Sequence, residues 1–254
     1  MPHRTAVRSA LACLAVAAGT AHAQVTQKPD GQWRSLFTAG ASVANGNSDA
    51  KSVSLGADVI KLTSSDKWAF TGAAQYARSA GATTANRQSL TGLHNRDITP
   101  QWFGFAQLDL VRDIPSDLSS RVTPSTGLGY HVVKEPDQTF DLSAGLAYTW
   151  DRYRVPQVVD GQMRTRRDHM GLLLAEESNN KLSDSTTLKQ KLTIYPSVSQ
   201  GDGVRTVFDA GLSVAMTKQL ALTATLSHRF DSQPGDGLKK NDTLFVTGLS
   251  LRFD

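Results

Sequence analysis

The sequence predicts an all-β protein: a single antiparallel up-and-down β-barrel of about twelve strands that spans a membrane. Three observations predict this fold class. Apolar residues alternate along nearly the whole chain, short and long connections alternate between the predicted strands, and aromatic residues gather at the strand ends. Residues 1–23 are a predicted signal peptide and residues 24–254 the predicted barrel.

The amino-terminal segment has the features of an export signal. Arg4 and Arg8 precede the apolar run "ALACLAVAAGTA", and "AHA" at residues 21–23 has the small-x-small form that predicts cleavage before Gln24. The one cysteine, Cys13, lies inside this segment, so the mature chain is expected to contain neither a disulfide nor a thiolate metal site. Beyond it, no stretch approaches the roughly 18 apolar residues that a membrane-spanning helix needs.

Charge and composition narrow the function classes. The formal charge of +4 includes Arg4 and Arg8, so the predicted mature chain carries +2, too little to indicate nucleic-acid binding. Charged residues make up 20% of the chain, somewhat below the roughly 25% typical of soluble domains, which weakly favours lipid contact.

The stretch "TFDLSAGLAYTWDRY", residues 139–153, gives the clearest alternation. Its apolar residues share one parity: Phe140, Leu142, Ala144, Leu146, Tyr148 and Trp150. A period of two places them on one face of a β-strand, while small, polar or acidic residues occupy the other face. A tilted strand needs about 9 to 11 residues to cross a bilayer, which accounts for the length of the pattern.

The same alternation recurs along the rest of the chain. Further strands are predicted within residues 37–43, 53–59, 68–76, 128–132, 208–216, 220–226 and 245–253. Weaker strands are predicted near residues 88–99, 101–112, 167–177 and 185–196.

The connections alternate in length. Short turns are predicted at residues 64–67, 99–101, 134–138, 179–184 and 217–219. Longer loops are predicted at residues 79–87, 113–120, 154–166, 197–203 and 231–241, whereas residues 45–49 are a short exception in which Asn45 and Gly46 suit a hairpin turn. An even number of strands then gathers short turns at one rim and long loops at the other, as in bacterial outer-membrane barrels with periplasmic turns and extracellular loops.

Aromatic residues mark both predicted rims. Trp33, Trp68, Trp102 and Phe140 begin strands that leave the short-turn rim, and Tyr76, Trp150 and Tyr153 end strands that enter long loops. Aromatic belts at both membrane interfaces favour this placement, because each ring has an apolar body and a polar edge. The alternative is that these rings fill the core of a soluble β-protein.

The composition of the two strand faces favours lipid over a soluble core. If the small and polar face were the outer surface of a soluble protein, it would carry too few Lys and Glu for solubility. A barrel of about twelve strands is also hard to fill, since about eight strands already give an interior just wide enough for side chains. We therefore expect Leu142, Leu212 and Leu222 to face outward.

Several segments resemble a known family. "AGASVANGNSDAKSVSLGADV", followed by Trp68 and Tyr76, then "GLGYHV" at 127–132 and "LSAGLAY" at 142–148, resembles the bacterial outer-membrane β-barrels called salt-induced outer membrane proteins. The resemblance covers nearly the whole mature chain, and its most specific part is the "GNSD" hairpin. It implies an outer-membrane barrel in a family with no established activity. Many such chains end in an aromatic residue read by the barrel assembly machinery, whereas here Phe253 is followed by Asp254.

Catalytic chemistry is not predicted. The mature histidines, His94, His131, His169 and His228, are too dispersed for a metal site, so neither a metal nor a cofactor is expected. None lies two residues before a serine, and neighbouring Ser227 and His228 point to opposite strand faces, although a Ser-His pair needs hydrogen-bond reach. A lipid-modifying barrel enzyme stays open through contacts between different strands.

One basic segment is a candidate lipid contact. "RYRVPQVVDGQMRTRRDH" contains five arginines and few acids: Arg152, Arg154, Arg164, Arg166 and Arg167. Guanidinium groups suit the phosphates of lipopolysaccharide, so outer-membrane lipid and lipopolysaccharide are the expected partners. Between the two, the sequence favours an ordinary solvated loop over lipopolysaccharide docking.

Charged residues are also predicted inside the barrel. Strand parity places eight of them opposite the lipid-facing residues: Asp58, Asp109, Asp141, Asp209, Lys189, Lys191, Arg229 and Arg252. Mixed charge favours internal pairing that braces the barrel and narrows its lumen, because charges in a partly desolvated interior are costly unless partnered. The alternative is hydration of these charges in a wide, water-filled lumen.

Three function classes follow from the sequence. The favoured one is a non-enzymatic integral outer-membrane barrel, acting as a narrow solute pore or as a stress-responsive envelope component. A lipid-modifying barrel enzyme and a soluble secreted β-protein that binds a ligand are the alternatives. Because Phe253 occupies the lipid-facing parity at the short-turn rim, it is also the predicted assembly signal.

Overall fold

The computed structural model describes residues 28–44, 50–159, 162–198, 203–234 and 238–253. The predicted signal peptide, the Asn45–Gly46 turn and Asp254 lie outside these residues, so the expectations about them stay predictions. No helix in the described part of the chain is long and apolar enough to cross a membrane.

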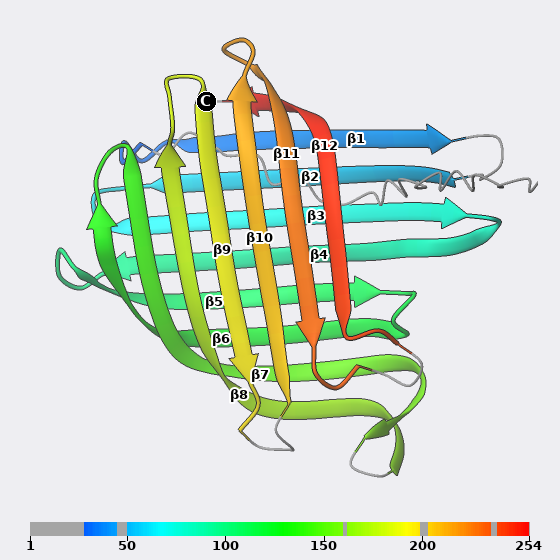
Figure 1. The fold of residues 1–254 in the computed structure, drawn as a ribbon. Helices are drawn as coiled ribbons and strands as arrows, with labels where there is room; N and C mark the ends of the chain where they lie inside the picture. The colour runs from blue at the N-terminus through cyan, green and yellow to red at the C-terminus, as the bar shows by residue number, and fades with distance from the viewer. Residues whose placement is uncertain (1–27, 45–49, 160–161, 199–202, 235–237, 254) are drawn as a thin grey trace, which may run out of the picture.

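Twelve antiparallel strands form one closed barrel, in which each strand pairs with its neighbours in the sequence and β12 pairs with β1 (Figure 1). The strands are β1 Trp33–Ala44, β2 Ala50–Leu62, β3 Asp66–Ser79, β4 Ala82–Asp97, β5 Trp102–Asp113, β6 Leu118–Lys134, β7 Gln138–Val159, β8 Gln162–Lys181, β9 Thr186–Pro196, β10 Val204–Ala215, β11 Leu220–Asp231 and β12 Asn241–Phe253. The predicted all-β, antiparallel, up-and-down barrel is confirmed, including the four weaker strands.

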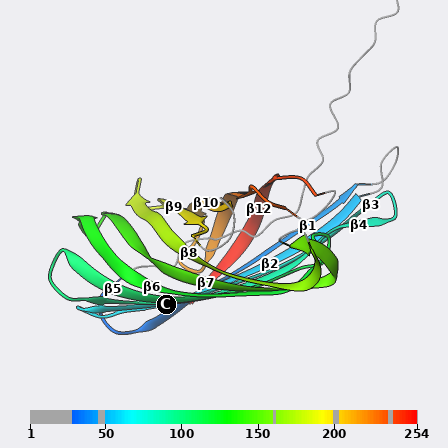
Figure 2. The same ribbon diagram turned by 90° about the horizontal axis from the view of Figure 1, so that it is seen from below.

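The barrel closes between its first and last strands. The ladder runs from Ser35 opposite Phe253 to Ala39 opposite Leu249. Closure leaves no free sheet edge, which is what allows β-strands to stand in a membrane. In Figure 1, β9–β12 cross steeply in front of β1–β5, and Figure 2 shows the same barrel from below. Such crossing is expected of tilted strands on opposite walls.

The alternating faces are clear in the exposure of individual side chains. Leu142, Leu212 and Leu222 are exposed on the outside, as predicted, while Thr149, Ser213 and Thr223 on the opposite strand faces are buried. The apolar face of this protein is therefore its outer surface. A soluble sheet protein would show the reverse, with the apolar face buried.

The predicted boundaries of the loops at the long-loop rim were partly wrong. β3 and β4 continue to Ser79 and from Ala82, so only Ala80 and Gly81 connect them, both with positive φ as in a tight hairpin turn. β7 and β8 likewise extend through most of the predicted loop 154–166. The hydrogen bonds between paired strands come from the backbone, so the strands can continue beyond the apolar band even where their side chains are polar.

Most of the aromatic residues lie on the outer surface near the strand ends. Trp33, Trp68, Trp102 and Trp150 are about half exposed there. The placement of Tyr153 in the outer belt was wrong. It is half-buried, and its hydroxyl donates a hydrogen bond to Asp151, whose side chain is buried in the interior. Its parity is opposite to that of Trp150, so the two rings cannot share a face.

Candidate functional site in the barrel lumen

An ion pair joins opposite walls of the barrel. Lys67 of β3 donates to Glu177 of β8 at 2.8 Å, although four strands separate β3 from β8 by the shorter way around the barrel. Lys191 of β9 lies 3.6 Å from the second oxygen of the same carboxylate. The side chains of Lys67 and Glu177 are only 14% and 12% exposed. Removing one partner of such a buried pair costs about 3–5 kcal/mol, because the other charge is left uncompensated.

An apolar cluster lies in the lumen beside this ion pair. Its buried members come from five strands: Leu93, Phe103, Phe105, Ala147, Leu173 and Tyr195. Phe103 is 2% exposed, and its ring lies over Gly129 of β6, where an added Cβ would come within 2.1 Å of the ring. A glycine is therefore required at this position for the aromatic ring to lie against the inner wall.

A second set of contacts crosses the lumen from β5 to β9. The Tyr195 hydroxyl donates to Asp109 at 3.2 Å, and the Gln107 amide donates to Asp109 at 2.7 Å and to Tyr195 at 3.4 Å. Lys191 donates to Gln107 at 3.5 Å. Together with the apolar cluster, these hydrogen bonds brace one wall of the barrel against the other.

Arginine-aspartate pairs gather at the loop end of the lumen. Arg121 donates to both oxygens of Asp151, at 2.6 and 2.7 Å, and the Asp151 side chain is 1% exposed. Two further pairs join neighbouring strands in the same manner: Arg87 with Asp113 at 2.7 Å, and Arg229 with Asp209 at 3.0 Å. The bidentate geometry of the first pair makes it the strongest of the three.

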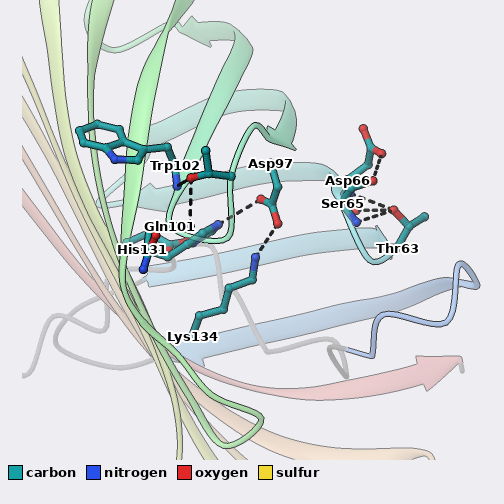
Figure 3. A network of polar contacts seen from close by, with 10 residues as sticks. Thr63, Ser65, Asp66, Asp97, Gln101, Trp102, His131 and Lys134 are labelled. Carbon is teal, nitrogen blue, oxygen red and sulfur yellow. Dashed lines mark hydrogen bonds and ion pairs between the residues drawn. The ribbon is translucent and has the colours of Figure 1, made fainter.

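A histidine lies between two carboxylates near the short-turn end of the lumen. His131 of β6 lies 2.7 Å from Asp141 through Nδ1 and 3.1 Å from Asp97 through Nε2. Lys134 also donates to Asp97, so two side chains of β6 converge on the end of β4 (Figure 3).

A separate pair joins the beginning of β1 to the segment that precedes it. The Arg34 guanidinium donates to both carboxylate oxygens of Asp30, and these hydrogen bonds hold the pKa of the Asp30 carboxyl well below its usual value. Arg34 itself is buried on the inner face of β1. Asp30 therefore supplies a countercharge to a buried guanidinium from outside the strands.

The eight charges predicted for the lumen all lie on strand faces that carry buried side chains. Asp58 accepts from Thr71, Asp109 from Thr91, and Asp141 contacts His131. Asp209 is opposite Lys191 in the β9–β10 ladder but pairs with Arg229. Lys191 instead pairs with Glu177, its register neighbour on β8.

Sequence reasoning missed the residues that cross the lumen. Lys67 and Arg205 have inward parity, which was readable from their neighbours Trp68 and Phe208. Glu177 had no such signal, because Leu172, Leu173 and Leu174 are consecutive apolar residues and hide the parity of β8.

The predicted lipopolysaccharide contacts fall into two groups. Arg152, Arg154, Arg164 and Arg166 are exposed on the extended β7–β8 hairpin. Arg167 differs, since it is half-buried and lines a cavity inside the barrel. An inward-facing arginine cannot contact lipid on the outer surface, so Arg167 is removed from this group.

Within the described ranges, no group of three histidine, aspartate or glutamate side chains lies close enough to hold an ion. The four histidines have varied surroundings. His94 lies against Asp66 and stacks on Trp68, and His228 contacts Thr243.

A closed barrel of twelve strands with an apolar outer surface is characteristic of one class of protein, the β-barrels of outer-membrane type. The chain belongs to the family described as "Protein of unknown function, DUF481", whose sequence profile matches residues 37–253. The comparison with curated proteins found no match.

Solved structures with a similar fold include several barrels. The NanC porin has a TM-score of 0.50 at 14% identity, with 86% of this chain and 97% of the porin covered. The translocator domain of the autotransporter NalP from Neisseria meningitidis has a TM-score of 0.44 at 15% identity, covering 90% and 91%. The KdgM porin, solved in complex with disordered oligogalacturonate, has a TM-score of 0.42 at 11% identity, covering 88% and 100%. At these identities the likeness to NanC shows the fold alone.

Proposed function

We propose that this protein is a non-enzymatic integral barrel of a Gram-negative outer membrane that forms, at most, a narrow pore. A cleaved signal peptide exports it, the short-turn end faces the periplasm, and the loop end faces outward. The observation that carries the proposal is the bridge of Lys67 and Lys191 to Glu177, which joins opposite walls beside a packed apolar cluster. Side chains that meet across a lumen leave little room for solute.

Membrane residence is supported by the exposed apolar outer surface and by the tryptophans near both rims. Carbonate washing of isolated membranes should leave the protein in the pellet. Its gel mobility should shift on boiling, because a folded barrel resists unheated detergent. Release into the soluble periplasmic fraction would favour the ligand-binding alternative instead.

The narrow pore is tested by conductance. The purified protein in planar bilayers should conduct weakly, and Asp209→Asn with Lys191→Gln should raise the conductance or lower the thermal stability, because these changes remove contacts to Arg229 and Glu177. Arg152→Gln, which changes an exposed arginine, is the control and should leave both unchanged. Large, steady currents from the unmodified protein would favour a general diffusion pore.

Lipopolysaccharide contact is proposed for the four exposed arginines of the β7–β8 hairpin, Arg152, Arg154, Arg164 and Arg166. Their guanidinium groups extend from a strand pair at the loop end, where they suit lipid phosphates. Replacing all four with glutamine should weaken binding to lipopolysaccharide vesicles and leave binding to neutral phospholipid vesicles unchanged. Equal binding by both proteins would favour a solvated hairpin.

The lipid-modifying enzyme is the alternative, and lipid analysis separates the two. His131 is held by two carboxylates, and His169 lines a cavity inside the closed wall rather than on the lipid face. Overexpression should therefore leave the acyl patterns of phospholipid and lipid A unchanged. An altered pattern that disappears on replacing His131 or His169 would overturn the non-enzymatic proposal. The stress-responsive role rests on the family resemblance, and expression at raised salt tests it.

A further inference from the structure

A small polar cavity lies inside the loop end of the barrel. It has a volume of about 30 Å³, and a cavity of roughly 10–15 Å³ by this measure already holds a water molecule. Its charged and aromatic lining comes from five strands: Arg121, Arg167, His169, Tyr195, Arg205 and Asp231. The cavity is therefore built by tertiary closure of the barrel rather than by one segment.

Three side-chain nitrogen atoms of this lining have no hydrogen-bond partner among the described residues. They are the Nε atom of Arg167, the Nδ1 atom of His169 and the Nη2 atom of Arg205, all inaccessible to solvent. A buried polar group without a partner destabilises the folded state. Three such groups around one cavity indicate that the cavity normally holds an acceptor.

The arginines of the cavity differ in how far their charge is neutralised. Arg121 is paired with Asp151 through two hydrogen bonds. Arg167 donates to the neutral amide of Gln233 at 2.9 Å. Arg205 lies over the Tyr195 ring, with its guanidinium carbon 4.0 Å from the ring centroid. Within the described part of the chain, neither Arg167 nor Arg205 forms an ion pair with a carboxylate.

One carboxylate, that of Asp231, also faces the cavity and offsets part of its positive charge. Asp231 is opposite Arg205 in the ladder, and one of its oxygens accepts from the backbone N–H of Gln233 at 3.0 Å. After Arg121 is balanced by Asp151, the guanidinium groups of Arg167 and Arg205 remain against this one carboxylate. The cavity therefore keeps an excess of positive charge and of donors.

We propose that this cavity is a binding site for a small free oxyanion of the phosphate or sulfate type. Arg205 and Arg167 would donate to its oxygens in the forked geometry that guanidinium offers, with His169 as a third donor. The stacking of Arg205 on Tyr195 orients its guanidinium before binding. A free ion fits better than a lipid headgroup, because the closed wall separates the cavity from the lipid face. The site goes beyond the proposed function and does not depend on conduction through the lumen.

Calorimetric titration of the refolded full-length barrel with inorganic phosphate, at constant ionic strength, tests the site. Phosphate should bind and raise the thermal midpoint, since a ligand that binds only the folded state stabilises it. Arg205→Met should weaken binding by roughly tenfold or more. Arg112→Gln, which changes an exposed arginine of β5, should bind as the unmodified protein does. Equal phosphate affinity in all three proteins, or no binding up to roughly 10 mM phosphate, would overturn the proposal.

Two further measurements distinguish loss of the phosphate site from misfolding of the variant and from lipid binding. In phosphate-free buffer, Arg205→Met should fold, shown by its heat-modifiable mobility. It should unfold no more easily than the unmodified protein, because it loses a buried charge that has no carboxylate partner. If the variant does not fold, Arg167→Gln replaces it in the titration. Vesicles of lipid A should not reproduce the phosphate effect, and a shift seen only with those vesicles would overturn the assignment to a free ion.

Discussion

The bridge across the lumen gives the sharpest test of how this barrel is stabilised. Glu177→Gln keeps the size of the side chain but removes the carboxylate that lies 2.8 Å from Lys67 and 3.6 Å from Lys191. Two ammonium groups then remain in the lumen without that countercharge. Because some solvent reaches these groups, we expect the lower part of the range for broken buried pairs, about 3 kcal/mol. A loss of that size lowers the folding equilibrium constant by roughly 150-fold, since about 1.4 kcal/mol is tenfold.

The measurement is the free energy of unfolding in phospholipid vesicles, from denaturant titration followed by tryptophan fluorescence and gel mobility. Glu176→Gln is the matched control, because Glu176 is the neighbouring residue, has the opposite parity, and accepts a hydrogen bond from Gln190 of the adjacent strand. Its effect should stay below about 1 kcal/mol.

A double variant distinguishes a broken bridge from general damage. Lys67→Met with Glu177→Leu replaces the pair by apolar side chains, which often restores stability in buried sites. Most of the loss should be recovered, and the two positions should be strongly coupled in a double-mutant cycle. If Glu177→Gln unfolds within about 1 kcal/mol of the unmodified protein, the lumen is hydrated there and the bracing argument is wrong.

Three further predictions concern single positions. Gly129→Ala should destabilise the barrel by about 1–3 kcal/mol, because the added Cβ would meet the Phe103 ring. Gly72 faces outward, and a Cβ added there would have its nearest contact at 3.9 Å, so Gly72→Ala should be tolerated in the same unfolding assay. Phe253→Ala should lower the yield of inserted barrel more than deletion of Asp254, because the Phe253 ring packs on Phe37 with 5.9 Å between centroids; equal, normal yields would contradict its role in assembly. The pKa of Asp30 is lowered by Arg34, so its stabilising effect should be complete above about pH 4 and decline as the pH falls further. Asp30→Asn should accordingly reduce stability at neutral pH, and an unchanged pH profile would count against this pair.

The sequence alone determined the barrel and the orientation of most side chains. A period of two is a property of the strand backbone, so the alternation around Leu142 or Leu222 assigns each residue to a face without knowledge of its neighbours in space. The predicted alternation in connection length held only in part, because two residues connect β3 to β4 at the rim where long loops were expected. The weakest assignments were at β8, where three consecutive leucines hide the parity, and at the strand ends, where the backbone ladder continues through polar residues around Ala82 and Arg164.

The contacts across the lumen were decided only by the tertiary structure. Lys67 and Glu177 are 110 residues apart, and their meeting depends on strand tilt, register and the closure of β1 on β12. The same holds for Tyr195 with Asp109, and for the cavity that brings Arg167 and Arg205 together. Parity shows that a side chain points inward, but its partner on the opposite wall is fixed by barrel geometry, which no local pattern in the sequence contains.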